Sequence, residues 1–250
     1  MKKLVVLRRT SQLAFFILFI YAVIYPFSSY FSSLFFSAIN PNLTVFISIS
    51  EKIFLPRLTV SLVMILLTLV LGRFFCGWIC PMGTFLDSAS IIRKKNKNLS
   101  DNRVGKLRYM KFFVLGAVFI SSLTGGNMVW FFDPLVNMSR FVLFFRNKVT
   151  DISGIAITGI LFLLIYVSAF FIPRLWCRVL CPLGAIYAFF SKFSLLKRKV
   201  SACANCDICK IKCRMGAIKD NADYIKGECV LCMDCVYDCP ERITKFTLKK

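Results

Sequence analysis

The stretch RFFCGWICPMG (residues 73–83) ends a long apolar segment and carries two cysteines, the second of which directly precedes a proline. The same pattern returns in RLWCRVLCPLG (174–184), with the arginine, both cysteines, the proline and the glycine in register. Proline is favoured in the first turn of a helix and disfavoured in its interior. The two CxxxCP motifs therefore predict helix breaks, with new helices that begin at Pro81 and Pro182.

The segments that lead into these motifs have the length and composition of membrane spans. Of the 250 residues, 58% are hydrophobic and 27 are phenylalanines, which is typical of a membrane protein. A helix needs about 20 apolar residues to cross roughly 30 Å of hydrocarbon. Four uncharged stretches are therefore predicted to be transmembrane helices: 13–24, which lies between Arg9 and Glu51, then 58–72, 112–132 and 152–173. The second stretch is short, so we expect it to be extended by Phe74 and Phe75, with the Arg73 side chain reaching the lipid headgroups.

Basic residues are distributed unevenly along the chain, whose net charge is +21. They precede the first span, fill the link between the second and third, and follow the fourth, while the other two links hold few. The positive-inside rule therefore places both termini and the middle link in the cytoplasm. The same charges suit contact with anionic lipid. This distribution favours the lipid membrane as a partner and argues against a nucleic acid.

The chain has twelve cysteines and no histidine, which excludes histidine-ligated haem, zinc and Rieske centres. Eight of the cysteines lie after residue 200 in two C-x2-C-x2-C-x3-C runs, the spacing of bacterial ferredoxins with two [4Fe–4S] clusters. In such runs the fourth cysteine binds the other cluster. The first cluster is therefore assigned to Cys203, Cys206, Cys209 and Cys239, and the second to Cys229, Cys232, Cys235 and Cys213. A pair of structural zinc sites is the alternative, although zinc CxxC pairs are usually separated by a longer gap.

Two domains follow from these patterns. Residues 1–199 are predicted to form an all-α membrane domain with four transmembrane helices and two CxxxCP helix breaks on the cytoplasmic side. Residues 200–250 are predicted to form a small α+β ferredoxin domain of the bacterial type, with two [4Fe–4S] clusters. Its basic residues would attract an acidic soluble donor such as a ferredoxin or flavodoxin. They are Lys210, Lys212, Arg214, Lys219 and Lys226.

The CxxxCP cysteines form a second set of thiols: Cys76, Cys80, Cys177 and Cys181. Both motifs follow a span that runs from outside to inside, so the four thiols are expected at one depth. Helix N-termini and the neighbouring Arg73, Arg174 and Arg178 are expected to lower the pKa of these thiols. Three interpretations stay open: packing residues that mark helix breaks, redox-active thiols or ligands of a metal or further cluster, and a docking surface for a partner or quinone.

These features together resemble the polyferredoxin-type membrane iron–sulfur proteins, a group that includes NapH-like, MauN-like and CcoG-like proteins and the C-terminal half of NosR-like proteins. The resemblance rests on the four spans, both CxxxCP motifs, the FDPL turn (132–135) and the cysteine-rich tail. It implies electron transfer between cytoplasmic donors or the quinone pool and a membrane or periplasmic acceptor, such as a periplasmic reductase system. Two other functions remain: a copper reductase or assembly factor, since soft thiolates suit Cu(I), and a redox-sensing regulator.

Overall fold

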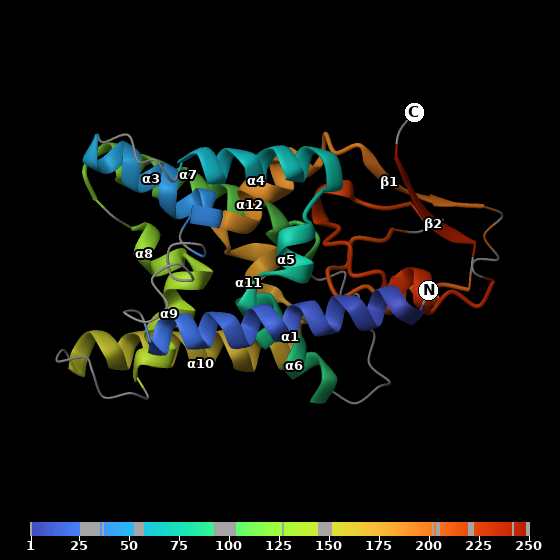
Figure 1. Cartoon of the computed structure of the whole chain (residues 1–250), viewed down its shortest axis with the longest axis horizontal. Coiled ribbons are helices and arrows are strands. Elements are labelled where there is room, and N and C mark those ends of the chain that lie inside the picture. Colours follow the sequence, from blue (N-terminus) through green and yellow to red (C-terminus); the bar gives the residue numbers. More distant parts are fainter. Residues whose placement is uncertain are drawn as a thin grey trace.

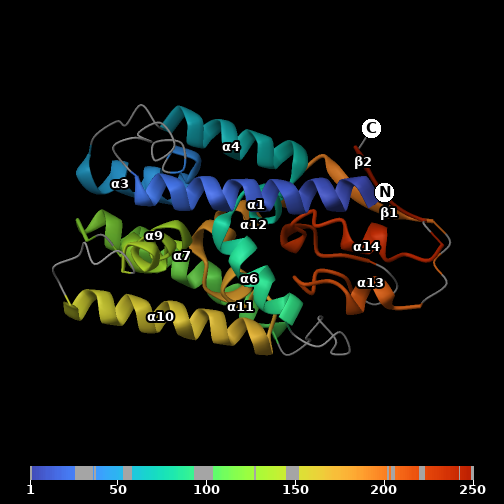
Figure 2. The ribbon, with the colours of Figure 1, turned by 60° about the horizontal axis from the view of Figure 1, so that its bottom comes forward.

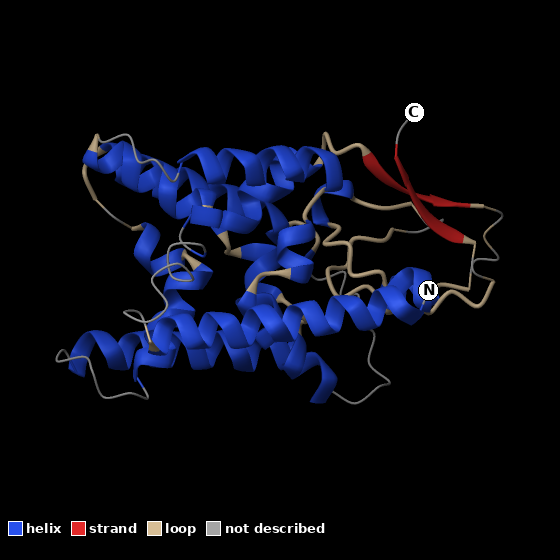
Figure 3. Ribbon diagram, viewed as in Figure 1, coloured by secondary structure: helices blue, strands red, loops and turns tan. Residues whose placement is uncertain are grey.

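Long helices run along the long axis of the molecule, and a small sheet lies at one end (Figures 1 and 3). In this computed structural model the described residues are 2–25, 36, 38–52, 58–92, 104–126, 128–144, 152–201, 203, 206–219, 223–241 and 243–248. The long helices are α1 (Lys2–Ile24), α4 (Leu58–Leu71), α7 (Met110–Leu123) and α10 (Ile152–Phe171). They cover the four stretches predicted to span a membrane, in whole or in part.

The outward faces of these helices are apolar, as expected for contact with lipid. Leu62 on α4, Phe113 on α7 and Leu164 on α10 are more than half exposed. Within the described residues, one helix, Lys3–Ile24, is long and apolar enough by itself to cross a membrane. Helices α4 and α7 have 14 residues each, or about 21 Å at 1.5 Å per residue. They are therefore shorter than a typical hydrocarbon core.

The third predicted span, 112–132, is divided in the structure. Helix α7 ends at Leu123, and Gly125 adopts a φ of 80°, a left-handed conformation that glycine reaches without steric cost. The short helix α8 (Val129–Phe132) follows, and Asp133 then caps α9 (Pro134–Phe144) by accepting from the amides of Leu135 and Val136. Apolar composition alone did not reveal this break.

Each CxxxCP motif forms a helix–break–helix unit. The first unit consists of α5 (Phe74–Trp78) and α6 (Pro81–Ile92), and the second of α11 (Leu175–Val179) and α12 (Pro182–Ser191). Gly72 lies between α4 and α5 and adopts a φ of 86°. The two units pack together in the main hydrophobic core, around the buried side chains of Phe75, Met82, Leu183 and Tyr187. The described residues before α4 add α3 (Pro41–Glu51), a helix that the sequence did not predict.

The tail is closed by a two-stranded antiparallel sheet. Strand β1 (Leu196–Val200) pairs with β2 (Thr244–Leu248), with Leu196 opposite Leu248. The described residues between the strands include the short helices α13 (Ile208–Ile211), η4 (Lys226–Glu228) and α14 (Asp234–Tyr237). Because β1 begins at Leu196, the tail starts slightly before the predicted boundary at residue 200. The tail and the N-terminus lie at the same end of the helices (Figures 1 and 2).

Candidate iron–sulfur sites and their junction with the helices

Four tail cysteines line one cavity, and they are the four that the sequence assigns to the second cluster: Cys213, Cys229, Cys232 and Cys235. Ala217, Ile218 and Val230 complete its apolar wall. Leu231 and Met233 adopt positive φ values of 52° and 61°, so the chain winds tightly between the cysteines. Four sulfur donors around an apolar cavity match the ligand set of a [4Fe–4S] cluster.

The other four tail cysteines lie nearer the surface. Cys203 and Cys206 are exposed, while Cys209 and Cys239 are partly buried. The charge of Cys203 acts on Cys209, so these two thiols lie near each other. Cys239 follows α14 and accepts from the amides of Ile243 and Thr244. This end of the tail is therefore the one open to solvent.

Arg198 in β1 contacts one thiol of each predicted cluster. Its side chain hydrogen-bonds to both Cys209 and Cys235, and it lines the cavity of the second set. The residue is 7% exposed, and its backbone N–H donates to Oη of Tyr224 at 2.9 Å. A buried cation stabilises nearby anionic thiolates. Sequence reasoning missed Arg198 because it precedes the first cysteine run and reaches the thiols only through the pairing of β1 with β2.

The membrane-side thiols Cys76, Cys80, Cys177 and Cys181 gather in the main core, where the two helix–break–helix units meet. The second cysteine of each motif is held in the same way. The amide of Gly184 donates to Sγ of Cys181 at 3.2 Å, and the amide of Gly83 donates to Cys80. The structure thus brings together four thiols from segments that lie far apart in the sequence.

Burial dominates the acidity of these thiols. It raises the pKa of Cys177 to about 11 and also raises the pKa values of Cys80 and Cys181. The helix ends and arginines act in the opposite direction but do not offset the desolvation of a buried thiolate. The expectation that the pKa of these thiols is lowered is therefore wrong for these three cysteines.

Arg73 and Arg174 hold the same position in the two motifs, and both are buried, with 0% and 1% exposure. The expectation that Arg73 reaches the headgroups is therefore wrong. Each guanidinium approaches the glycine of the other motif. A Cβ added to Gly184 would lie 3.0 Å from Nη2 of Arg73. A Cβ added to Gly83 would lie 3.6 Å from Nη2 of Arg174. The two motifs therefore face each other in a reciprocal arrangement.

Buried carboxylates join both arginines to the tail. Glu228 of the tail binds Nη1 of Arg73 at 3.1 Å and also pairs with Lys111 at the start of α7. Asp87 on α6 accepts two hydrogen bonds from Arg174, at 2.7 and 2.8 Å, and pairs with Arg214 of the tail at 3.2 Å. The Asp87 carboxyl is buried, but Arg174 and Arg214 hold its pKa well below its usual range.

Some of the basic residues expected to attract a donor have internal partners instead. Arg214 also pairs with Asp234 at 3.3 Å, and Lys226 donates to the carbonyl oxygen of Ser194. Lys219 is exposed, and Lys210 and Lys212 are partly exposed. Lys210, Lys212 and Lys219 thus contribute positive charge to the surface of the tail.

Backbone contacts bring the first CxxxCP motif directly against the second set of tail cysteines. Gly77 lies on the carbonyl group of Val230, leaving no room for a Cβ, and Nε1 of Trp78 donates to the carbonyl oxygen of Leu231 at 3.1 Å. Cys76 packs on the same apolar cluster as Cys213 and Cys232. The membrane-side thiols therefore adjoin the second set of tail cysteines.

Within the described part of the chain, no three Cys, Asp or Glu side chains are placed to hold one metal ion. A zinc ion takes four ligands tetrahedrally at one centre. A cubane binds each thiolate at a different iron atom, so its ligands stand further apart.

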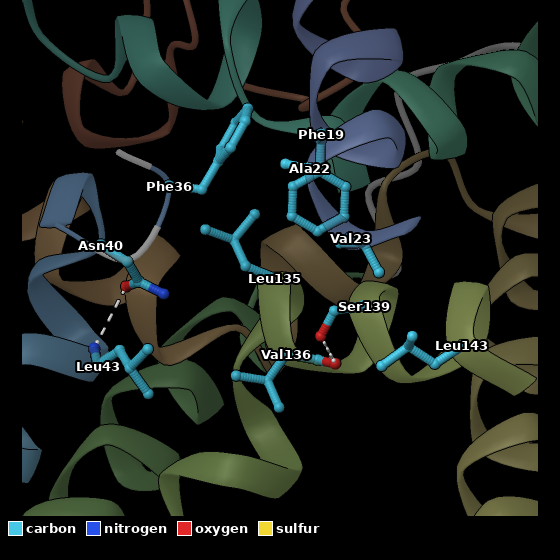
Figure 4. Close-up of a pocket in the computed structure, with 10 residues that line it drawn as sticks. All are labelled: Phe19, Ala22, Val23, Phe36, Asn40, Leu43, Leu135, Val136, Ser139 and Leu143. Atoms are coloured by element: carbon cyan, nitrogen blue, oxygen red, sulfur yellow. Dashed lines mark hydrogen bonds between the residues drawn. The ribbon is translucent and has the colours of Figure 1, made fainter. Parts of the chain in front are cut away.

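A separate apolar cavity of about 310 Å³ lies between α1, α3 and α9, at the end of the helices away from the sheet (Figures 1 and 4). Figure 4 shows Phe19, Phe36 and Leu135 around the open space, with Asn40 and Ser139 as polar neighbours. The Asn40 side chain caps α3 and donates to the buried Asp133 at 2.7 Å. The polar groups beside this cavity are thus held in place by hydrogen bonds within the protein.

Comparisons with known proteins agree with these features. A family model described as a 4Fe-4S binding domain matches residues 54–100 and 155–202, the two segments that carry the CxxxCP motifs. An uncharacterized protein of Methanocaldococcus jannaschii is 29% identical over 99% of this chain and 97% of its own length. The ferredoxin-type protein NapH of Haemophilus influenzae is 28% identical over 75% of this chain and 67% of its own length. The methylamine utilization ferredoxin-type protein MauN of Paracoccus denitrificans is 31% identical over 58% of this chain and 49% of its own length. No solved structure matches the chain.

Proposed function

Because the chain belongs to the polyferredoxin-type membrane iron–sulfur proteins and is an iron–sulfur electron-transfer protein, we propose that it passes electrons between a soluble donor at the tail and quinone in the membrane. One observation carries this proposal. Cys76 of the first CxxxCP motif packs on the same apolar cluster as Cys213 and Cys232 of the tail, so the membrane-side thiols adjoin the inner set of tail cysteines. Buried redox sites in close succession suit electron transfer.

The tail cysteines form two sets of four, and each set would hold one cluster. Cys213, Cys229, Cys232 and Cys235 would hold one, and Cys203, Cys206, Cys209 and Cys239 the other. A [4Fe–4S] cluster supplies one-electron chemistry, and its potential depends on charge, hydrogen bonds and solvent exposure. Ala217 and Val230 exclude water from the inner site, and Arg198 places a positive charge between the two sets.

The donor would approach the exposed end of the tail. Cys203 and Cys206 are exposed there, whereas the second set lies against the helices. Lys210, Lys212 and Lys219 give this tail a positive surface, which favours an acidic ferredoxin or flavodoxin. We place α1, α4, α7 with α8, and α10 across the inner membrane of a prokaryote, with both termini in the cytoplasm. The shared position of the N-terminus and tail supports this topology.

The cavity between α1, α3 and α9 supports quinone as the membrane partner. Its volume lies at the lower end of the usual range for small-molecule sites, about 300–1,000 Å³, and its walls are mainly apolar. Phe19, Phe36 and Leu135 belong both to these walls and to the core that holds the membrane-side thiols. An isoprenoid quinone, which has an apolar tail and a flat ring, fits these surroundings.

Reaction with quinone can be tested in lipid nanodiscs. Under anoxic conditions, a short-chain quinone should reoxidise the dithionite-reduced protein. The reaction is measured from the visible absorbance of the clusters. Val136→Phe fills the cavity and should slow reoxidation at least tenfold with unchanged iron content. Val63→Phe makes the same change on the exposed face of α4 and should react like the wild type. Equal rates for all three proteins would show that quinone does not react at this cavity, and material without clusters would end the electron-transfer proposal.

A further inference from the structure

We propose that Cys76, Cys80, Cys177 and Cys181 bind a third iron–sulfur cluster, of the [4Fe–4S] type, between Arg73 and Arg174. The inference deepens the proposed function by adding a redox site between the tail and the quinone cavity. Its electron-transfer role rests on that function, but the binding of the cluster does not. The cluster can therefore be tested separately.

The thiols provide the number and kind of ligands that a cluster needs. All four belong to the main core, in which Cys80, Cys177 and Cys181 are buried and Cys76 is partly buried. Sulfur ligands of iron–sulfur clusters commonly accept hydrogen bonds from the protein. Here the amides of Gly83 and Gly184 already donate to the second sulfur of each motif.

The unpaired donors of Arg73 point to an anionic ligand. Its Nη1 atom binds Glu228, but Nε and Nη2 are buried and have no hydrogen-bond partner among the described residues. Nη2 is the atom that approaches Gly184, and the charge of Arg73 acts on Cys76, Cys177 and Cys181. A buried charged donor without an acceptor is unfavourable. A cluster with four thiolate ligands is anionic and would supply acceptors at this position.

The two motif glycines leave room for this arrangement. A Cβ on Gly184 would lie 3.0 Å from Nη2 of Arg73 and 3.2 Å from the carbonyl oxygen of Cys177. A Cβ on Gly83 would lie 2.7 Å from the carbonyl oxygen of Cys76. In each motif the amide of the glycine donates to the second cysteine. Because glycine has no Cβ, the carbonyl oxygen of the first cysteine can lie close to this glycine. Packing of inert thiols alone would not explain the reciprocal placement of two buried arginines beside them.

The family comparison and the position of the motifs also favour a cluster. Both segments matched by the 4Fe-4S family model contain one of the motifs, and neither reaches the tail cysteines. The contact of Cys76 with the apolar cluster that also holds Cys213 and Cys232 places the third site directly beside the second.

The test measures metals per chain and does not depend on activity. Full-length protein is purified without oxygen in detergent, and iron, sulfide, copper and zinc are determined. Three [4Fe–4S] clusters contain about twelve irons and the two tail clusters about eight. The double variant Cys76→Ser with Cys177→Ser should lose about four irons, while the EPR signals of the tail clusters persist. The control Cys232→Ser should instead disturb the tail signals.

The iron content of the wild type and of the double variant decides whether the third cluster is present. About eight irons in the wild type, unchanged in the double variant, would overturn the third cluster while leaving the proposed function intact. Copper or zinc that is lost on substitution would also overturn it, and copper would favour a role in copper handling. Twelve irons without reaction with quinone would uphold the cluster and count against the proposed function. If the double variant does not fold, spin quantitation and Mössbauer spectra of the wild type still decide between two and three clusters.

Discussion

The carboxylate of Glu228 in the tail lies 3.1 Å from Nη1 of Arg73 in the first CxxxCP motif, with both side chains buried. The same carboxylate pairs with Lys111 at the start of α7. A single acidic side chain therefore holds two buried cations and ties the tail to two separate helical segments. The position of the cluster ligands relative to the membrane-side thiols depends on this contact.

We expect Glu228→Gln to destabilise the protein markedly, because it removes the buried carboxylate that pairs with both Arg73 and Lys111. Removing one partner of a buried ion pair typically costs about 3–5 kcal/mol. The variant should lose its clusters at a lower temperature than the wild type. Cluster loss is measured from the decrease in visible absorbance on heating. Glu241→Gln makes the same change at an exposed position and is the control. Equal temperatures for the two variants would show that the buried pair contributes little.

The sequence could indicate local chemistry but not the burial of charges. Proline placement predicts helix starts from local sterics alone, and α6 and α12 begin at Pro81 and Pro182. The two C-x2-C-x2-C-x3-C runs are likewise recognised from spacing. Arg73 was misjudged because its environment depends on where Glu228 packs, far away in the chain. The roles of Arg198 and Gly77 depend in the same way on contacts between distant segments.

The contact between Gly77 and Val230 gives a sharper test of the junction. A Cβ at Gly77 would overlap the carbonyl oxygen of Val230, so Gly77→Ala should push the tail away from the helices. Overpacking of this kind costs about 1–3 kcal/mol. Limited proteolysis should then cut the tail faster than in the wild type.

Gly116→Ala is the matched control, because no atom lies within 4 Å of its Cβ position on α7. Alanine is also favoured over glycine inside a helix. We expect this variant to match or slightly exceed the stability of the wild type. If Gly77→Ala and Gly116→Ala resist protease equally well, the proposed tight junction is wrong.

Arg198 should set the potentials of both tail clusters, because it hydrogen-bonds to Cys209 and Cys235. Arg198→Gln removes a buried positive charge and should make both clusters harder to reduce. A tenfold change in a one-electron equilibrium corresponds to ~59 mV, and we expect negative shifts of that order in an EPR-monitored redox titration. Lys199→Gln removes a neighbouring charge that is exposed and should leave both potentials nearly unchanged. A shift confined to one cluster would mean that Arg198 does not lie between the two.

Removal of iron should unfold the tail but not the helices. In its described residues the main apolar cluster of the tail is small, with Met215, Ala217 and Val230 as its buried members. A domain of this size usually needs bound metal to fold, and cluster binding then contributes to the free energy of folding. After oxidation and chelation, protease should cleave between β1 and β2, while the far-ultraviolet circular dichroism of the helices is largely kept. Reconstitution with iron and sulfide should restore protection, whereas a tail that stays protected without iron would show that packing against Gly77 and Arg73 is sufficient to fold it.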